Sequence, residues 1–247
     1  MNRCAVILAG GEGKRMKSDI PKPMNEVLGK PMLRWVIDSV RTAGVNDICV
    51  VTGYKKEITE EYLKGLPFPV ETVYQSERLG TGHAVMMAEE FLRRKGGDTV
   101  ILCGDAPFMD ADTISGAFRQ HDADGCAATV ISAMLEDPTG YGRVVRNDDD
   151  TLKGIVEHKE ADEKTLAIKE VNSGGYWFDT ADLLSVLDDI TANNSAKEYY
   201  LPDALDLLLQ AGKKVGAYTA ASADTVLGAN DPQQLEELNR IAAQKGY

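Results

Sequence analysis

The segment CAVILAGGEGKRMKSDIPKP, residues 4–23, joins an apolar run to a glycine-rich loop with several basic side chains. Its first six residues are apolar and favour a buried β-strand. The glycines that follow allow backbone N–H groups to approach an anion closely. Residues 14–22 carry four basic side chains and one acidic one, in a chain whose formal net charge is −12. The segment therefore predicts an anion site at the end of a strand, with an ordinary tight turn as the alternative.

Two familiar phosphate loops do not fit this segment. A Walker A loop would require a glycine where Leu8 stands and a hydroxyl where Arg15 stands. A Rossmann glycine pattern would require its third glycine where Met16 stands. Arg15 nevertheless offers a planar fork for phosphate oxygens, and Lys22 offers a point charge between two stiffening prolines. We therefore expect the loop to bind a triphosphate, with Arg15 and Lys22 offsetting its charge.

Strand and helix patterns alternate through the first half of the chain, which predicts right-handed crossovers and a mostly parallel sheet. The expected strands here are 4–9, 47–53, 70–75 and 98–105, and the expected helices are 32–44, 56–64 and 82–95. Strand patterns dominate the second half, at 126–135, 142–147, 152–158 and 170–180, with helices at 181–189, 199–212 and 231–246. We expect one α/β domain, 1–247, with two lobes: a nucleotide-binding half (about 1–125) and an antiparallel substrate half (about 126–230), followed by a C-terminal helix (231–247).

Composition excludes several classes of protein. A net charge of −12 disfavours nucleic acid or an anionic membrane as the main partner. The N-terminal apolar run is too short for a signal sequence, and no stretch approaches a membrane span. The four cysteines form no CxxC motif, which favours buried, reduced thiols in a cytoplasmic protein. The three histidines lack metal-binding spacing; we expect His121 to be solvated and His83 to cap or pack at the start of a helix.

Seven further stretches accompany the glycine loop: QSERLGTGHA (75–84), GDAPFM (104–109), DPTGYGRVVR (137–146), GIVEHKEA (154–161), EVNSGGY (170–176), EYYLPD (198–203) and GAND (228–231). Together they resemble the sugar-1-phosphate nucleotidyltransferases. In order and spacing they are similar to the uridyltransferase (pyrophosphorylase) half of the bacterial bifunctional N-acetylglucosamine-1-phosphate uridyltransferase/glucosamine-1-phosphate acetyltransferases. No hexapeptide repeat of the acetyltransferase β-helix occurs in the 247 residues, so we expect the uridyltransferase alone.

The resemblance implies a nucleotide-diphospho-sugar transferase, or glycosyltransferase-A-like, fold. Such a fold has a Rossmann-like, mixed but mostly parallel central sheet flanked by helices, with a smaller antiparallel lobe that binds the sugar. The resemblance also implies three sets of site residues: Leu8, Ala9, Gly10, Gly11, Gln75, Gly80 and Thr81 for the nucleotide; Gly142, Glu157, Asn172 and Tyr200 for the sugar; and Asp105 and Asn230 for Mg²⁺. The Gln75 amide can both donate and accept, which matches the edge of uracil. Cytosine presents the reverse pattern, and a mispaired buried polar group costs about 1–3 kcal/mol.

The implied reaction converts UTP and N-acetyl-α-D-glucosamine 1-phosphate into UDP-N-acetylglucosamine and pyrophosphate, by Mg²⁺-assisted in-line attack on the α-phosphorus. Arg15 and Lys22 would be its catalytic residues. Its partners would be small molecules, and the chain would be a monomer or small homo-oligomer in the cytoplasm. One alternative is a glucose-1-phosphate uridylyl- or thymidylyltransferase, because Ser173 and Pro202 replace threonines expected near the sugar. Another is a non-catalytic sugar-nucleotide-binding subunit, which should have lost Arg15, Lys22 or Asp105; all three are present.

Overall fold

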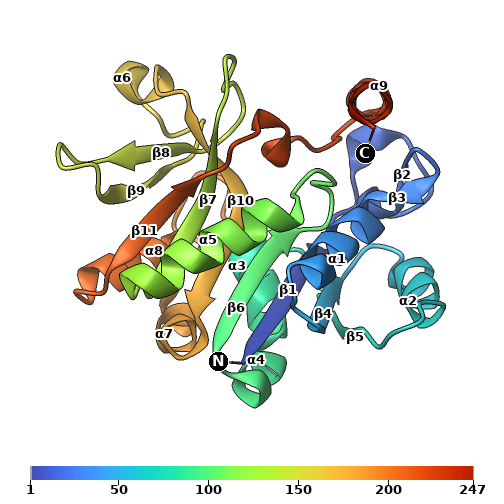
Figure 1. Cartoon of the computed structure of the whole chain (residues 1–247), viewed down its shortest axis with the longest axis horizontal. Helices are drawn as coiled ribbons and strands as arrows, with labels where there is room; N and C mark the ends of the chain where they lie inside the picture. The colour runs from blue at the N-terminus through green and yellow to red at the C-terminus, as the bar shows by residue number, and fades with distance from the viewer. Residues whose placement is uncertain (1, 247) are drawn as a thin grey trace.

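The computed structural model describes residues 2–246, whose strands form a twisted central sheet with helices on both faces (Figure 1). The strands are β1 (Arg3–Ala9), β2 (Glu26–Val27), β3 (Lys30–Pro31), β4 (Asp47–Thr52), β5 (Glu71–Tyr74), β6 (Asp98–Cys103), β7 (Ala128–Met134), β8 (Arg143–Arg146), β9 (Leu152–Val156), β10 (Glu170–Asp179) and β11 (Val215–Thr219). The α-helices are α1 (Met32–Thr42), α2 (Lys56–Lys64), α3 (Thr81–Met87), α4 (Glu89–Lys95), α5 (Ala111–Asp124), α6 (Glu163–Leu166), α7 (Thr180–Val186), α8 (Asp203–Gln210) and α9 (Pro232–Lys245). Short 3-10 turns are η1 (Lys14–Met16), η2 (Lys22–Met24), η3 (Leu187–Asp189) and η4 (Ala223–Val226).

The central sheet is mixed. Within residues 2–246 it has nine strands, seven of them in the order β11-β7-β10-β6-β1-β4-β5, and the β8–β9 hairpin extends from β10. Four of the six neighbouring pairs along this path are parallel, and β10 runs antiparallel to both of its neighbours. Strands β2 and β3 form a separate small antiparallel sheet. The predicted mixed, mostly parallel sheet flanked by helices is confirmed.

Strand β1 shows how the sheet separates two cores. Successive side chains of a strand point to opposite faces. Val6 packs on one face with apolar residues of α3, α4, α7 and α8. Ala5 and Ile7 pack on the other face with residues of α1, α2 and α5. All three side chains are fully buried, as expected of a central strand covered on both faces.

Several elements differ from the sequence expectation. The helix expected over 82–95 is divided at Ala88 into α3 and α4. The helix expected from residue 199 begins only at Asp203, because Tyr199 instead makes backbone hydrogen bonds with residues 79 and 82. Strand β11 was not predicted. It lies at the edge of the sheet and is held by its parallel pairing with β7, a partner far away in the sequence.

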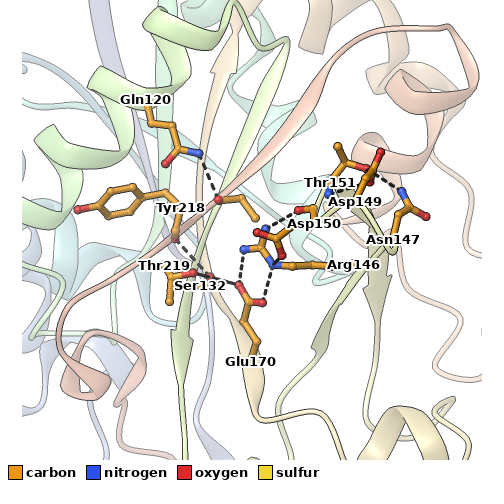
Figure 2. A network of polar contacts seen from close by, with 11 residues as sticks. Gln120, Ser132, Arg146, Asn147, Asp149, Asp150, Thr151, Glu170, Tyr218 and Thr219 are labelled. Atoms are coloured by element: carbon orange, nitrogen blue, oxygen red, sulfur yellow. Dashed lines mark hydrogen bonds and ion pairs between the residues drawn. The ribbon is translucent and has the colours of Figure 1, made fainter.

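A buried carboxylate ties together the strands on the β11 side of the sheet. Glu170 of β10 accepts hydrogen bonds from Ser132 Oγ (2.6 Å) on β7 and from Arg146 Nε (2.8 Å) on β8, and Thr219 of β11 also donates to it (Figure 2). Burial acts to raise the pKa of Glu170, but the bonds from Arg146 and Ser132 outweigh it and the pKa is lowered. Glu170 therefore stabilises the fold as a carboxylate, and this contribution is lost as pH falls through its lowered pKa.

The C-terminal helix α9 returns to the N-terminal part of the chain, beside β2 and β3 (Figure 1). Leu238 and Ala242 join a small core with Met16 of η1. The backbone N–H of Leu28 donates to Asn239 Oδ1 at 2.8 Å. Helix α9 thus supports the glycine-rich loop from outside the central sheet.

The positions of His121 and of the four cysteines can be compared with the sequence expectation. The expectation that His121 is solvated is wrong: its side chain is buried, and its Nδ1 lies 3.0 Å from Thr129 Oγ1. All four cysteines are free, and burial raises the pKa of Cys103 to about 12. Across residues 2–246, none of the helices combines the length and the apolar character that crossing a membrane requires.

Candidate active site

Two adjoining pockets open at the carboxyl ends of β1 and β6. The glycine-loop pocket, about 300 Å³, is lined by Leu8, Gly10, Gly11, Lys22, Pro23, Gln75, Arg78, Gly80, Thr81, Ala84, Cys103, Asp105 and Glu198. The β10 pocket, about 220 Å³, is lined by Leu8, Thr81, Cys103, Glu157, Asn172, Gly174, Tyr176, Glu198, Tyr200, Leu201 and Pro202. The two pockets share Leu8, Thr81, Cys103 and Glu198, so they lie side by side with a common wall. Ligands of open α/β sheets bind at such strand ends.

Close backbone contacts explain the glycines of the first pocket. A Cβ on Gly10 would lie 2.9 Å from Gln75 Oε1, and a Cβ on Gly53 would lie 2.4 Å from the Gly10 carbonyl oxygen. Gly13 has φ 65°, and a Cβ there would lie 2.8 Å from Cβ of Lys22. Glycine is therefore required at two kinds of position: where the loop packs against the turn after β4, and where its backbone lies against the Lys22 side chain.

Lys22 lines the glycine-loop pocket and contacts two polar side chains, Asp105 and Asn230. Its Nζ donates to Asn230 Oδ1 at 2.7 Å and forms an ion pair with Asp105 Oδ2. The segment carrying Asn230 fits closely against Asp105, since a Cβ on Gly228 would lie 2.8 Å from the Asp105 carbonyl oxygen. The buried Asn25 amide donates to the Lys22 carbonyl at 2.9 Å and holds the backbone of the lysine.

These contacts also test whether the two predicted ligands suit a magnesium ion. One carboxylate oxygen and one amide oxygen converge on a single cationic atom, Lys22 Nζ, which stands where a cation would be held. In the described part of the chain, no group of three or more His, Cys, Asp or Glu side chains could hold a metal ion. Mg²⁺ commonly takes one or two protein oxygens and fills its other positions with water and phosphate oxygens. Asp105 and Asn230 therefore fit this ion.

Gln75 has a defined amide orientation. Its Nε2 lies 3.1 Å from the Gly80 carbonyl oxygen, which can only accept, and 3.1 Å from His83 Nδ1. Both amide hydrogens are thus engaged within the protein, and only Oε1 remains for a ligand. In this arrangement the amide offers a ligand its oxygen rather than both a donor and an acceptor.

Two loops meet across the junction of the pockets. The N–H of Gly82 donates to the Tyr199 carbonyl and the N–H of Tyr199 donates to the Leu79 carbonyl, both at 2.7 Å. Thr81 Oγ1 accepts from the Leu201 N–H at 3.0 Å. Gly80 at the centre of this contact has φ 112°, and a Cβ there would lie 2.5 Å from the Tyr199 carbonyl oxygen. The loop pair fixes the position of the first pocket relative to the second.

We expect Gly80→Ala to lower the free energy of unfolding by about 2 kcal/mol or more, because alanine resists this backbone conformation and its methyl group meets the other loop. Chemical denaturation measures the change. Gly11→Ala is the matched control, since a Cβ at Gly11 would meet nothing within 4 Å. Equal stability losses in the two variants would contradict the assignment.

The β10 pocket contains acidic and amide side chains among apolar ones. The Asn172 N–H donates to the Gly142 carbonyl at 2.9 Å, and Asn172 Nδ2 donates to the Tyr176 hydroxyl at 2.7 Å. A Cβ on Gly142 would lie 3.1 Å from Glu157 Oε1, so this glycine packs closely beside the carboxylate. Burial, and then the charges of Glu160 and Asp203, raises the pKa of Glu157. The three residues expected to bind the sugar around β8 to β10 are therefore neighbours, and Tyr200 lines the same pocket.

The structure does not place every predicted residue in the lining of the two pockets. Arg15 is exposed on η1 and lines neither pocket, and Ala9 is buried in the core below the loop. Gly142 and Asn230 also line neither pocket, although Gly142 lies beside Glu157 and Asn230 contacts Lys22. Arg78, which was not predicted, lines the glycine-loop pocket and its Nη2 donates to Glu12 Oε2 at 3.0 Å. It lies between Gln75 and Gly80 in the sequence, and a search for basic residues there would have found it. Glu198 and Cys103 were missed as lining residues because no charge pattern marks them.

Comparison with known proteins places this geometry in context. The profile of the family described as Nucleotidyl transferase matches residues 4–225. Proteins described as bifunctional protein GlmU are 44% identical over 237 residues in Acetivibrio thermocellus, covering 96% of this chain and 51% of that protein. In Clostridium beijerinckii the identity is 46% over 241 residues, covering 98% and 52%. The chain thus spans about half the length of these curated relatives.

Two solved structures share the fold at low sequence identity. A UDP-glucose pyrophosphorylase without ligand superposes with a TM-score of 0.83 at 16% identity, covering 100% of both chains. A UDP-glucose pyrophosphorylase complexed with UDP-glucose superposes with a TM-score of 0.81 at 18% identity, covering 99% of this chain and 100% of the other. At these identities the likeness concerns the fold alone.

Proposed function

Because the chain belongs to the nucleotidyl transferase family, and is an enzyme of that class, we propose that it joins UTP to N-acetyl-α-D-glucosamine 1-phosphate. The products are UDP-N-acetylglucosamine and pyrophosphate. The observation that carries this proposal is a pair of pockets that share a wall. One is lined by glycines, Lys22 and Asp105, and the other contains Glu157, Asn172 and Tyr200. Similarity to the bifunctional GlmU proteins over about half their length supports the choice of substrates.

The proposed nucleotide lies in the glycine-loop pocket. Gln75 Oε1, as an acceptor, suits the N3–H of uracil, whereas cytosine presents a lone pair at N3. Leu8, Gly10, Gly11, Gly80 and Thr81 line the same pocket and would surround the base and ribose. The triphosphate would extend toward Lys22 and toward Arg78, which lines the pocket, whereas Arg15 does not.

The proposed sugar phosphate lies in the β10 pocket, between Glu157, Asn172 and Tyr200. Its phosphate oxygen, already ionised near neutral pH because the second pKa of a phosphate monoester is about 6, attacks the α-phosphorus of UTP in line. The new bond joins that oxygen to the α-phosphorus, and the bond from the α-phosphorus to the pyrophosphate oxygen breaks. The protein aligns two anions and offsets their charge, so no side-chain nucleophile is required.

Asp105 and Asn230 would hold a magnesium ion, which would neutralise phosphate charge during the transfer. The Lys22 ammonium lies between the same two oxygens, so lysine and metal compete for one place. We therefore propose that Lys22 turns from these ligands toward the phosphates in the loaded enzyme. The two-lobed division into nucleotide and sugar halves, the cytoplasmic location and the oligomeric state stay predictions.

The test is release of pyrophosphate. We expect rapid release from UTP with N-acetylglucosamine 1-phosphate, and slower release with glucosamine 1-phosphate or glucose 1-phosphate. Faster turnover of glucose 1-phosphate with UTP or dTTP would favour the alternative uridylyl- or thymidylyltransferase. No turnover of any pair, with sugar nucleotide still bound, would favour a non-catalytic subunit.

Glu157 should give sugar binding a pH dependence. As a carboxylate it accepts hydrogen bonds from sugar hydroxyls, and its raised pKa means that it becomes protonated at a higher pH than an ordinary glutamate. We expect KM for the sugar phosphate to rise as pH falls from about 8 to 5. In Glu157→Gln that KM should already be raised about tenfold at pH 8.

The sugar phosphate also titrates in this range, with a second pKa of about 6. Both enzymes experience that titration equally, so the ratio of the two KM values isolates the contribution of Glu157. We expect the ratio to shrink toward acid. A ratio that stays constant across the range would contradict the role of a charged Glu157.

A further inference from the structure

His83 contacts the residue proposed to recognise the base. It lies in the first turn of α3, two residues after Thr81, and its Nδ1 lies 3.1 Å from Gln75 Nε2. Its ring centroid lies 6.1 Å from that of Tyr199, whose backbone holds the loop around Gly80. His83 therefore lies behind Gln75, on elements that are themselves fixed.

The contact between Gln75 and the Gly80 carbonyl indicates which ring nitrogen of His83 is protonated. A carbonyl oxygen accepts only, so the group of Gln75 that faces it at 3.1 Å is the NH₂ group. The same NH₂ group faces His83 Nδ1, which must then present a lone pair. In this arrangement Nδ1 of His83 accepts, which leaves the ring proton on Nε2.

We propose that His83 is a positioning residue that holds the Gln75 amide with its oxygen toward the base, and so makes the pocket select uracil over cytosine. This inference rests on the proposed function. A reversed amide would turn its NH₂ group toward the base, where it would suit the N3 lone pair of cytosine and face the N3–H of uracil. Two acceptors, the Gly80 carbonyl and His83 Nδ1, oppose that reversal.

Two substitutions separate this role from simple packing. His83→Leu fills similar space without an acceptor. His83→Asn places an acceptor, Oδ1, the same number of bonds from Cα as Nδ1. We expect His83→Leu to lower the ratio of kcat/KM for UTP to that for CTP about tenfold, chiefly through a higher KM for UTP. We expect His83→Asn to keep the wild-type ratio within about twofold.

An unchanged ratio in His83→Leu, or an equal loss in the leucine and asparagine variants, would overturn the proposal. The ¹⁵N chemical shift of His83 Nδ1 in the wild-type protein provides a measurement that needs neither turnover nor a variant. We expect the shift of an unprotonated ring nitrogen, and a protonated Nδ1 at neutral pH would overturn the proposal as well. If wild-type protein turns over no nucleotide, the proposed function fails, whereas the nitrogen shift still tests the position of His83.

Discussion

Replacing Lys22 by alanine is expected to lower kcat by about 10²–10³, the loss seen when one charged or hydrogen-bonding group is removed from a developing anion. Lys22 is the basic residue that both lines the glycine-loop pocket and contacts the proposed metal ligands. Its side chain is largely buried, with 14% exposed, so water replaces its charge poorly.

Lys14→Ala is the matched control, because Lys14 belongs to the same basic loop but is exposed and absent from the lining of both pockets. Its kcat should stay within about twofold of wild type, since a distant exposed charge is screened. Thermal unfolding should show that both variants fold. A Lys22→Ala enzyme that keeps more than about a tenth of wild-type kcat would contradict the role of this lysine.

Comparing Arg15→Ala with Arg78→Ala shows which of the two arginines contributes to nucleotide binding. The sequence analysis chose Arg15 because it lies beside the glycines, but the structure leaves it exposed and places Arg78 in the pocket lining. Position in a local motif does not determine where a long side chain ends when the loop turns through η1. We expect Arg78→Ala to raise KM for the nucleotide more than Arg15→Ala does.

Local chemistry explains which parts of the fold could be predicted. The apolar runs of β1, β4 and β6 and the glycine turn after β1 depend on residues close together in the sequence, and they are found where expected. Strand β11 depends on pairing with β7, and the late start of α8 depends on backbone bonds to residues 79 and 82. Such long-range partners leave no local pattern to read.

The same distinction applies to the site. Lys22 could be chosen from its own surroundings, between two prolines in a basic loop. Its partner Asn230 lies 208 positions away and came only from the family resemblance. The accepting role of Gln75 could not be predicted either, because it depends on how the Gly80 carbonyl and the His83 ring face its amide.

Replacing Asp105 by alanine is expected to reduce turnover by about 10³ and to raise at least tenfold the Mg²⁺ concentration that gives half-maximal rate, as expected when a metal ligand is lost. Asp105 follows the end of β6, and its carboxylate lies with Asn230 around a single cationic position. Asp112→Ala is the control, because Asp112 is exposed on α5 and lines neither pocket. Its rate and its Mg²⁺ dependence should match those of the wild type.

Asp105 could act only by holding Lys22, and a double variant separates that role from metal binding. If holding the lysine were its whole function, Lys22→Ala/Asp105→Ala would be no slower than Lys22→Ala alone, because neighbouring residues that act as one unit are not additive. We expect the double variant to be slower than either single variant, with the Mg²⁺ dependence of Asp105→Ala. Asp105 and Lys22 would then contribute opposite charges to one transfer, the carboxylate through the metal and the ammonium through the phosphates.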